Sequence, residues 1–248
     1  MAERMIVLKK VGFIGFGNMA EAIISGMISS GNYESEEIGA YDTDADKLNA
    51  GAEKLGFIAF DSNEKLVADC ETVILAVKPI ALQKALTPLR DVFCKANPLV
   101  ISIAAGQSIE RLKDLLGYDA KIVRVMPNIN ATALQAVSGY VSSENVTDDE
   151  EKTALKILTS FGTAVAVDED KFSVYSAVAG CSPAYVYLFI DAIARVGVKY
   201  GLTKKDSLAI VTEAVISTIS TDEKTDSEAL DKVVLNAIDA AYNKDKGM

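Results

Sequence analysis

The stretch Val11 to Ala22, VGFIGFGNMAEA, decides the fold, because an apolar run breaks at glycines and continues with helical spacing. Gly15, Gly17 and Ala20 fit the pattern G-x-G-x-x-[GA], which joins the first strand to the first helix of a dinucleotide-binding fold. The first glycine makes the tight bend, the second lets the backbone approach a pyrophosphate, and the small third residue packs the helix on the strand. A glycine-rich turn that serves packing alone is the alternative.

The composition of the 248-residue chain predicts a globular protein with a small-molecule partner. Lys plus Arg number 25 against 35 Asp plus Glu, so no basic surface is offered to nucleic acid or to anionic lipid. Histidine is absent, which excludes Ser-His and Cys-His pairs and histidine-based metal sites. The three cysteines lack C-x-x-C spacing, so they predict small core residues in a reducing compartment and no metal site. The apolar run in the first ten residues is too short for a signal peptide or a membrane span, which predicts a cytoplasmic protein.

The first two thirds of the chain alternate short apolar runs with helical patterns, which is typical of parallel βαβ units. From Asp168 onward the pattern is helical. We therefore expect an α/β fold, with an N-terminal Rossmann dinucleotide-binding domain over residues 1–167 and an all-helical dimerisation and substrate domain over residues 168–248. Eight strands are predicted at 11–14, 38–41, 57–60, 72–77, 99–103, 121–125, 138–141 and 163–167, and helices at 19–30, 44–55, 148–158, 184–200, 204–219 and 226–243.

An acidic residue, Asp42, follows the second predicted strand. Dinucleotide folds place a carboxylate at this point to bind the adenosine ribose hydroxyls. A helix N-cap or a solvated loop charge is the alternative, although Asp44 could cap the next helix instead. Two carboxylates with only Lys47 as a nearby cation would repel a 2′-phosphate, so the sequence favours NADH over NADPH.

Three further strand ends carry residues suited to a ligand, because ligands of open parallel sheets lie outside the carboxyl ends of the strands. The small residues Ala104-Ala105-Gly106 at one of these ends would let the backbone approach a nicotinamide ring, and Asn128 at another would offer an amide. Pro79 is expected to end the strand that precedes it. Each segment also reads as an ordinary turn or helix lead-in. The segments are Ala76-Val77-Lys78-Pro79, Ala104-Ala105-Gly106 and Met126-Pro127-Asn128.

The helix that begins at Pro183 is apolar on most of its faces, with the sequence AYVYLFIDAIA. One packed side does not require so many apolar residues, so this helix predicts a subunit interface, with a homodimer as the smallest closed assembly.

Five ordered segments resemble the pyrroline-5-carboxylate reductase family: GFIGFGNMAEAIISG, ILAVKP, ISIAAGQSIERL, VRVMPN and AGCSPAYVYLFIDAI. The resemblance implies an enzyme that reduces 1-pyrroline-5-carboxylate to L-proline with NADPH or NADH, and a helical domain that forms dimers, sometimes within larger rings. It implies that Asn128 and Ser182 lie beside the nicotinamide and the substrate. It also implies cofactor contacts at Gly15, Gly17, Asn18, Met19, Ala76, Val77, Lys78, Pro79, Ala104, Ala105 and Gly106.

The absence of histidine is compatible with this chemistry. A cyclic imine needs a hydride, which the cofactor supplies, and a proton that its nitrogen takes from solvent or from a hydroxyl. The protein then has to hold the imine carbon against the nicotinamide and to bind the substrate carboxylate.

The chain also departs from this family. Members have a segment resembling VTSPGGTT that binds the substrate carboxylate, whereas this chain continues after Ile216 as STISTDEKTDSEAL. Asn130 stands where the family usually has threonine and proline after its asparagine, and Cys181 stands at a position that is usually glycine or serine.

Three functions are therefore compatible with the sequence. The first is an active reductase whose carboxylate site is rebuilt from a partner subunit or from the hydroxyl cluster Ser217, Thr218, Ser220 and Thr221. The second is a dinucleotide-binding, dimeric scaffold with weak or no reductase activity. The third is a reductase related to the β-hydroxyacid dehydrogenases, against which the segment AGCSPAYVYL lacks the lysine that those enzymes use.

Overall fold

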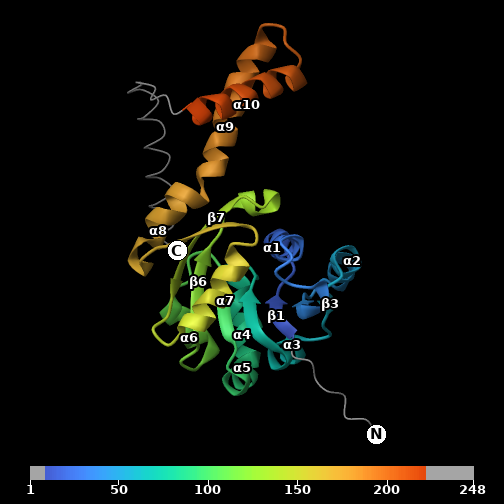
Figure 1. Ribbon diagram of the computed structural model, residues 1–248, viewed down its shortest axis with the longest axis vertical. Helices are drawn as coiled ribbons and strands as arrows, with labels where there is room; N and C mark the ends of the chain where they lie inside the picture. The colour runs from blue at the N-terminus through green and yellow to red at the C-terminus, as the bar shows by residue number, and fades with distance from the viewer. Residues whose placement is uncertain (1–8, 222–248) are drawn as a thin grey trace. The chain divides into compact units, whose positions relative to one another are not determined.

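The computed structural model describes residues 9–221, and the chain divides into two compact units, one ending at Tyr175 and one beginning at Ser176 (Figure 1). The first unit is an eight-stranded sheet with helices, and the described part of the second unit is helical. The predicted α/β fold with a helical C-terminal region is confirmed. The domain boundary after residue 167 stays a prediction.

The strands of the first unit follow the order β3-β2-β1-β4-β5-β6-β7-β8. The chain therefore returns to the middle of the sheet after β3, and this switch point between β1 and β4 opens a crevice at the carboxyl ends of the strands. The strands are β1 (Lys9–Ile14), β2 (Ile38–Tyr41), β3 (Ile58–Ala59), β4 (Cys70–Leu75), β5 (Leu99–Ser102), β6 (Ile122–Met126), β7 (Ala136–Ser142) and β8 (Gly162–Ala166). All eight predicted strands are present.

One strand pair departs from the predicted pattern of parallel βαβ units, because β7 runs antiparallel to β6. Val125 pairs with Tyr140, and Met126 pairs with Gly139. The connection between the two strands holds only the 3₁₀ turn η3 (Ile129–Ala133). Parallel neighbours need a crossover of a dozen or more residues, so this short connection returns the chain in the opposite direction.

Helices cover both faces of the sheet. Consecutive strand residues face opposite sides, so Ile74 belongs to the apolar cluster that includes residues of α1, α2 and α7, whereas Leu75 belongs to the cluster that includes residues of α3, α4, α5 and α6. Together the two apolar clusters hold the carboxyl ends of the strands in place. The helices are α1 (Asn18–Ser29), α2 (Ala45–Leu55), α3 (Asn63–Asp69), α4 (Pro79–Leu86), α5 (Arg90–Ala96), α6 (Ile109–Leu116) and α7 (Asp148–Leu158).

Pro79 begins a helix and does not end a strand, which corrects the sequence prediction. The strand β4 stops at Leu75, and Pro79 is the first residue of α4. Proline suits this position because its missing N–H would have no partner inside the helix and its fixed φ is already helical.

The chain leaves the sheet through the 3₁₀ turn η4 (Glu169–Lys171) and the short helix α8 (Phe172–Tyr175). The second unit begins with a π-helical turn (Ser176–Gly180) and continues as α9 (Ser182–Lys199) and α10 (Lys204–Thr221). These two long helices confirm the predictions at 184–200 and 204–219, and the helix predicted at 226–243 lies outside the described residues.

Tight packing joins α9 to α10. The buried Ser207 hydroxyl donates a hydrogen bond of 2.7 Å to the carbonyl oxygen of Ala194. A Cβ built on Gly197 would lie 2.2 Å from Oγ of Ser207. The two helices therefore approach each other closely at small residues.

The cysteines are only partly the core residues that the sequence predicted. All three are free; Cys70 is buried and Cys181 is half-buried, but Cys94 is exposed. Among the described residues no group of three or more Cys, Asp or Glu side chains is placed to hold a metal ion.

Glu150 on α7 gives the stability of the first unit a pH dependence. Burial raises the pKa of Glu150, but the Lys121 ammonium and two hydrogen bonds from Thr147 outweigh burial and hold it below its ordinary value of 4.5. A lowered folded-state pKa stabilises the protein above pH 4.5, and this contribution is lost as the pH falls through the folded-state value.

We expect Glu150→Gln to lower the free energy of unfolding at pH 7 by about 1 kcal/mol, and the difference from the wild type to shrink on acidification. Urea unfolding at pH 7 and at pH 4 measures both differences. A difference that stays constant between these pH values would contradict the assignment.

Candidate functional site

The glycine turn between β1 and α1 lies at the switch point of the sheet. Gly15 has a φ of 96°, and a Cβ built on it would lie 2.8 Å from Cγ1 of Val77 and 3.0 Å from the carbonyl carbon of Ala76. Its N–H donates a hydrogen bond of 2.8 Å to the carbonyl oxygen of Tyr41. Only glycine accepts both this positive φ and the close approach of Val77 and Ala76, so Gly15 is required by the shape of the turn itself.

Gly17 is different, because apart from its two chain neighbours no described residue has an atom within 4 Å of a Cβ built on it. Its φ of −91° and ψ of −177° suit any residue. Gly17 is the N-cap of α1 and offers no side chain to the first amides of that helix, which begins with Asn18 and Met19. Uncapped amides at a helix N-terminus are suited to bind a pyrophosphate, so the open space at Gly17 fits a ligand.

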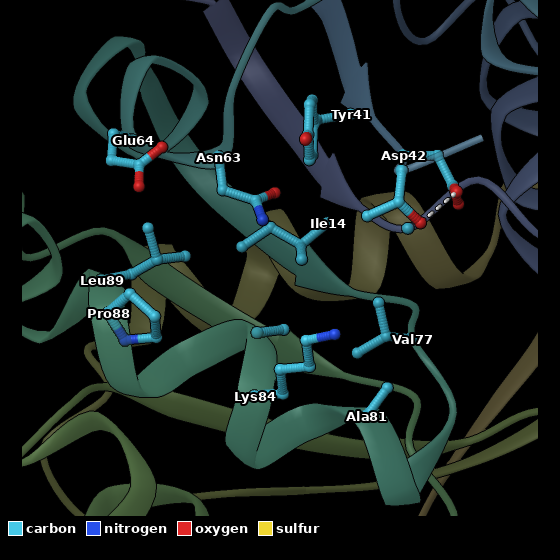
Figure 2. A pocket seen from close by; sticks show the side chains of 13 residues that line it. Ile14, Tyr41, Asp42, Asn63, Glu64, Val77, Ala81, Lys84, Pro88 and Leu89 are labelled. Atoms are coloured by element: carbon cyan, nitrogen blue, oxygen red, sulfur yellow. Dashed lines mark hydrogen bonds between the residues drawn. The ribbon is translucent and has the colours of Figure 1, made fainter. Parts of the chain in front are cut away.

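A cavity of about 320 Å³, the first cavity, opens beside the glycine turn. Figure 2 shows Tyr41, the last residue of β2, and Asp42, which follows it, on one side of this cavity, and Ala81 and Lys84 of α4 on the other. Ile14 contributes to its apolar wall. The position beside the acidic residue that ends β2 is the one at which dinucleotide folds bind adenosine.

The carboxylate of Asp42 connects the two loops that border the first cavity. One oxygen accepts a hydrogen bond of 2.7 Å from the N–H of Phe16, and the other accepts one of 2.9 Å from the N–H of Asp44. Asp44 is the residue that caps α2, through a hydrogen bond of 3.1 Å from the N–H of Lys47. Asp42 is therefore not the N-cap. Its Oδ1 also accepts a hydrogen bond of 3.5 Å from the Thr43 hydroxyl, whereas among the described residues its Oδ2 accepts only the one from Phe16 and keeps a lone pair that can face a ribose hydroxyl.

Sequence reasoning missed three polar residues of the first cavity, Asn63, Glu64 and Lys84. Asn63, the first residue of α3, lines it and has a buried Oδ1 with no hydrogen-bond partner in the described structure. Lys84 lines it with no ion pair among the described residues. A buried amide oxygen without a partner is costly, so Asn63 marks a place for a hydrogen-bond donor such as an adenosine N–H or O–H group. The sequence signal was weak, because Ser-Asn before an apolar run also reads as a helix start.

The second cavity, of about 290 Å³, brings the three predicted strand ends together. Met19, from the first turn of α1, contributes to the same wall. The lining residues from the strand ends are Ala76, Val77, Lys78, Pro79, Ile103, Ala104, Ala105, Met126 and Pro127. Segments far apart in the sequence thus form one apolar surface of a size that suits a nicotinamide ring.

The remaining predicted residues lie around these cavities or in the second unit. Gly106 has a φ of 70° and follows Ala105 directly, and Asn18 lines a separate polar hollow with Glu21. Asn128 is 6% exposed, and its Oδ1 accepts a hydrogen bond of 3.4 Å from the N–H of Val137. Ser182 lies in the second unit as the first residue of α9, where its hydroxyl donates to the carbonyl oxygen of Val178.

The second unit leaves large apolar side chains of α9 exposed. Leu188 is 69% exposed, and Val186, Phe189, Ile193 and Val196 are 40–54% exposed. The stretch Glu169–Lys199 is also long and apolar enough to cross a membrane, judged by length and composition alone. An apolar surface of this extent on one chain is typical of a subunit interface.

Two family models match the chain. The first is described as "NADP oxidoreductase coenzyme F420-dependent" and matches residues 10–106. The second is described as "Pyrroline-5-carboxylate reductase dimerisation" and matches residues 169–235, which include the apolar helix α9.

Similar proteins agree with these two matches. The chain is 36% identical over 208 residues to the pyrroline-5-carboxylate reductase of Methanosarcina acetivorans, covering 84% of this chain and 77% of the relative. It is 37% identical over 213 residues to that of Aquifex aeolicus, covering 86% and 77%. The crystal structure of Plasmodium falciparum pyrroline carboxylate reductase with NADP bound matches with a TM-score of 0.85 and 27% identity, covering 96% of this chain and 97% of that one. The chain therefore belongs to the pyrroline-5-carboxylate reductase family.

Proposed function

We propose that this protein reduces 1-pyrroline-5-carboxylate to L-proline with NAD(P)H, as a step of proline biosynthesis. The observation that carries the proposal is the pair of cavities near the glycine turn, one lined by Gly15 and Asp42 with ribose-binding chemistry and one with an apolar lining that includes Met19. Family membership supports 1-pyrroline-5-carboxylate as the substrate, because the relatives that match most of the chain are named pyrroline-5-carboxylate reductase.

The residues divide between the two halves of the cofactor. The amides after Gly17, at Asn18 and Met19, would hold the pyrophosphate, while Asp42 and Asn63 would hold the adenosine. The nicotinamide, when bound, supplies the hydride. The second cavity would place that ring, with contacts from Ala76, Val77, Lys78, Pro79, Ala104, Ala105 and Gly106.

Two further residues would act on the substrate side. Asn128 is nearly buried, and its Oδ1 already holds the N–H of Val137, so its amide is fixed in direction. Ser182 opens α9 and would offer a hydroxyl near the imine, as the family resemblance implies. Neither group has to act as a strong acid, because the iminium nitrogen can carry its own proton.

NADH is the cofactor we expect this protein to prefer. Asp42 and Glu64 place two carboxylates in the first cavity against the single ammonium of Lys84, so a 2′-phosphate would be repelled. The expected advantage of NADH is about tenfold in kcat/KM, which corresponds to about 1.4 kcal/mol. Steady-state rates with both cofactors measure it.

Two variants sharpen this test of cofactor preference. Asp42→Asn keeps an oxygen for the N–H of Phe16 and removes the charge, so it should reduce the preference. Lys84→Met should increase the preference, because it removes the one cation that lines the first cavity among residues 9–221. A clear advantage of NADPH in the wild type would contradict the role given to Asp42.

The second unit is proposed to form the dimer. Phe189→Asp should convert the dimer to monomers, because a two-fold interface repeats each contact and the new charge enters it twice. Lys199→Glu, a charge change at the end of the same helix, is the matched control and should leave the dimer intact. Sedimentation velocity distinguishes the two states, and a Phe189→Asp variant that stays dimeric would place the interface elsewhere.

A scaffold that binds dinucleotide but turns over slowly is the second candidate function. The observation that favours it is the absence from the sequence of a segment resembling VTSPGGTT, which in the family binds the substrate carboxylate. We propose a cytoplasmic location for either function, since a biosynthetic reductase draws on the NAD(P)H of that compartment.

Product analysis tests the proposed function. The protein is incubated with 1-pyrroline-5-carboxylate and NADH, and L-proline is quantified against the NADH consumed, with the Gly17→Val variant as a control. One proline for each NADH supports the proposal. Consumption of NADH without proline, by a protein that binds the cofactor, would contradict it.

A further inference from the structure

We propose that Glu169 is a positioning residue, which holds the nicotinamide side of the site through the start of α6. The inference rests on the proposed function. Glu169 begins the turn η4, outside both cavities, and lies some sixty residues along the chain from the loop it contacts. Glu169 would thereby determine the shape of the second cavity without lining it.

One oxygen of Glu169 joins two separate elements of the first unit. Oε1 accepts a hydrogen bond of 2.7 Å from the N–H of Ile109, the first residue of α6, and one of 3.0 Å from Nη1 of Arg124 on β6. The Ser108 hydroxyl accepts from the N–H of Arg111 at 3.1 Å, so the two side chains together satisfy the start of α6. A carboxylate at this end of a helix is also favoured by the helix dipole.

Both elements lead directly to the lining of the second cavity. Ala104 and Ala105 line it, and only three residues separate them from Ile109. Met126 also lines it and lies two residues after Arg124, so the two side chains point from the same face of β6. Glu169 therefore fixes two of the three strand ends that form this cavity.

The contact is built to be rigid. The Arg124 side chain is 12% exposed, and its guanidinium carbon lies 4.3 Å from the centre of the buried Phe172 ring. A cation held between an aromatic ring and a carboxylate has little freedom, because leaving either partner exposes an unpaired charge to a poorly solvated site. The loop that contains Ala104 and Ala105 therefore ends at a residue, Ile109, whose N–H is bound by a firmly held carboxylate.

A comparison of two ligands tests the inference without measuring turnover. ADP-ribose lacks the nicotinamide, so its binding reports on the first cavity and the pyrophosphate turn, whereas NADH also reports on the second cavity. In Glu169→Ala the dissociation constant for NADH should rise by about tenfold, since small displacements at a positioned ring are costly, while that for ADP-ribose stays at the wild-type value. Titration calorimetry measures both constants.

Two variants separate positioning from stability. Glu169→Gln keeps an oxygen that can accept from the N–H of Ile109, and it should restore NADH binding. Glu150→Ala removes another partly buried carboxylate, which pairs with the Lys121 ammonium and accepts a hydrogen bond from the N–H of Thr147 at the start of α7. Neither Lys121 nor Thr147 lines a cavity described above. Glu150→Ala should leave the ratio of the two dissociation constants unchanged.

Glu169→Ala leaves Arg124 without its carboxylate, so the double variant Arg124→Met, Glu169→Ala serves where the single variant fails to fold. It should fold and still bind NADH more weakly than ADP-ribose, relative to the wild type. A wild-type ratio of the two dissociation constants in folded Glu169→Ala or in the folded double variant, or the same change in Glu150→Ala, would overturn the inference alone. Failure of the wild type to bind ADP-ribose would instead overturn the proposed function.

Discussion

Gly17→Val is expected to bind NADH more weakly than the wild type by on the order of a hundredfold, about 3 kcal/mol, while unfolding at nearly the same temperature. The loss follows from the place that the valine side chain would take, above the amides of Asn18 and Met19, where a pyrophosphate would lie. The unchanged stability follows from the open space that a Cβ at residue 17 would meet and from a φ of −91° that valine accepts.

Gly15→Ala is the matched control for this prediction. Its φ of 96° and its approach to Val77 and Ala76 make any side chain strained, so this variant should lose stability. Fluorescence titration with NADH and thermal unfolding monitored by circular dichroism measure the two properties. Unchanged NADH affinity in Gly17→Val would remove the dinucleotide assignment of the turn.

The second large effect is expected in substrate binding. Hydrogen bonds to a charged group contribute roughly 1.5–3 kcal/mol each. The loss of two such contacts to the carboxylate of pyrroline-5-carboxylate would lower kcat/KM by on the order of a hundredfold to ten-thousandfold relative to a family-typical enzyme. NADH affinity should be normal, because the residues that line the two cavities proposed to hold the cofactor all lie between residues 11 and 130.

The hydroxyl cluster near the end of α10 is the place where this chain could replace those contacts. Ser217 is exposed in the last turns of α10, and the side chains of Thr218, Ser220 and Thr221 lie outside the described residues. Caps and solvated turn positions are the common roles of such residues. Family-typical turnover by the wild type, lost in a Thr218→Val, Thr221→Val variant, would show that the cluster has replaced the missing segment.

Much of the fold could be predicted because local patterns and tertiary structure agree. The apolar runs gave all eight strands, and the second strand ends at Tyr41 as predicted. The helix 148–158 was predicted to the residue, since Thr147 and Glu150 form a capping box at its start. The second cavity was also accessible from sequence, because strand ends of a parallel sheet meet at one edge.

The features that sequence reasoning missed depend on contacts between distant segments. The direction of β7 is set by the length of its connection to β6, which an apolar pattern does not contain. Asn63 reads as an ordinary helix start until the first cavity surrounds it. Glu169 reads as a charge in an acidic turn, and only the fold brings it to the N–H of Ile109.

The most direct test of the account is a single turnover of NADH bound to the protein. The complex is mixed rapidly with excess 1-pyrroline-5-carboxylate, and the absorbance of the bound NADH is followed while L-proline is quantified. The account predicts that the bound NADH is oxidised with formation of an equal amount of proline, at a rate that keeps rising with substrate concentration because the substrate is weakly held. Bound NADH that stays reduced at every substrate concentration would contradict it.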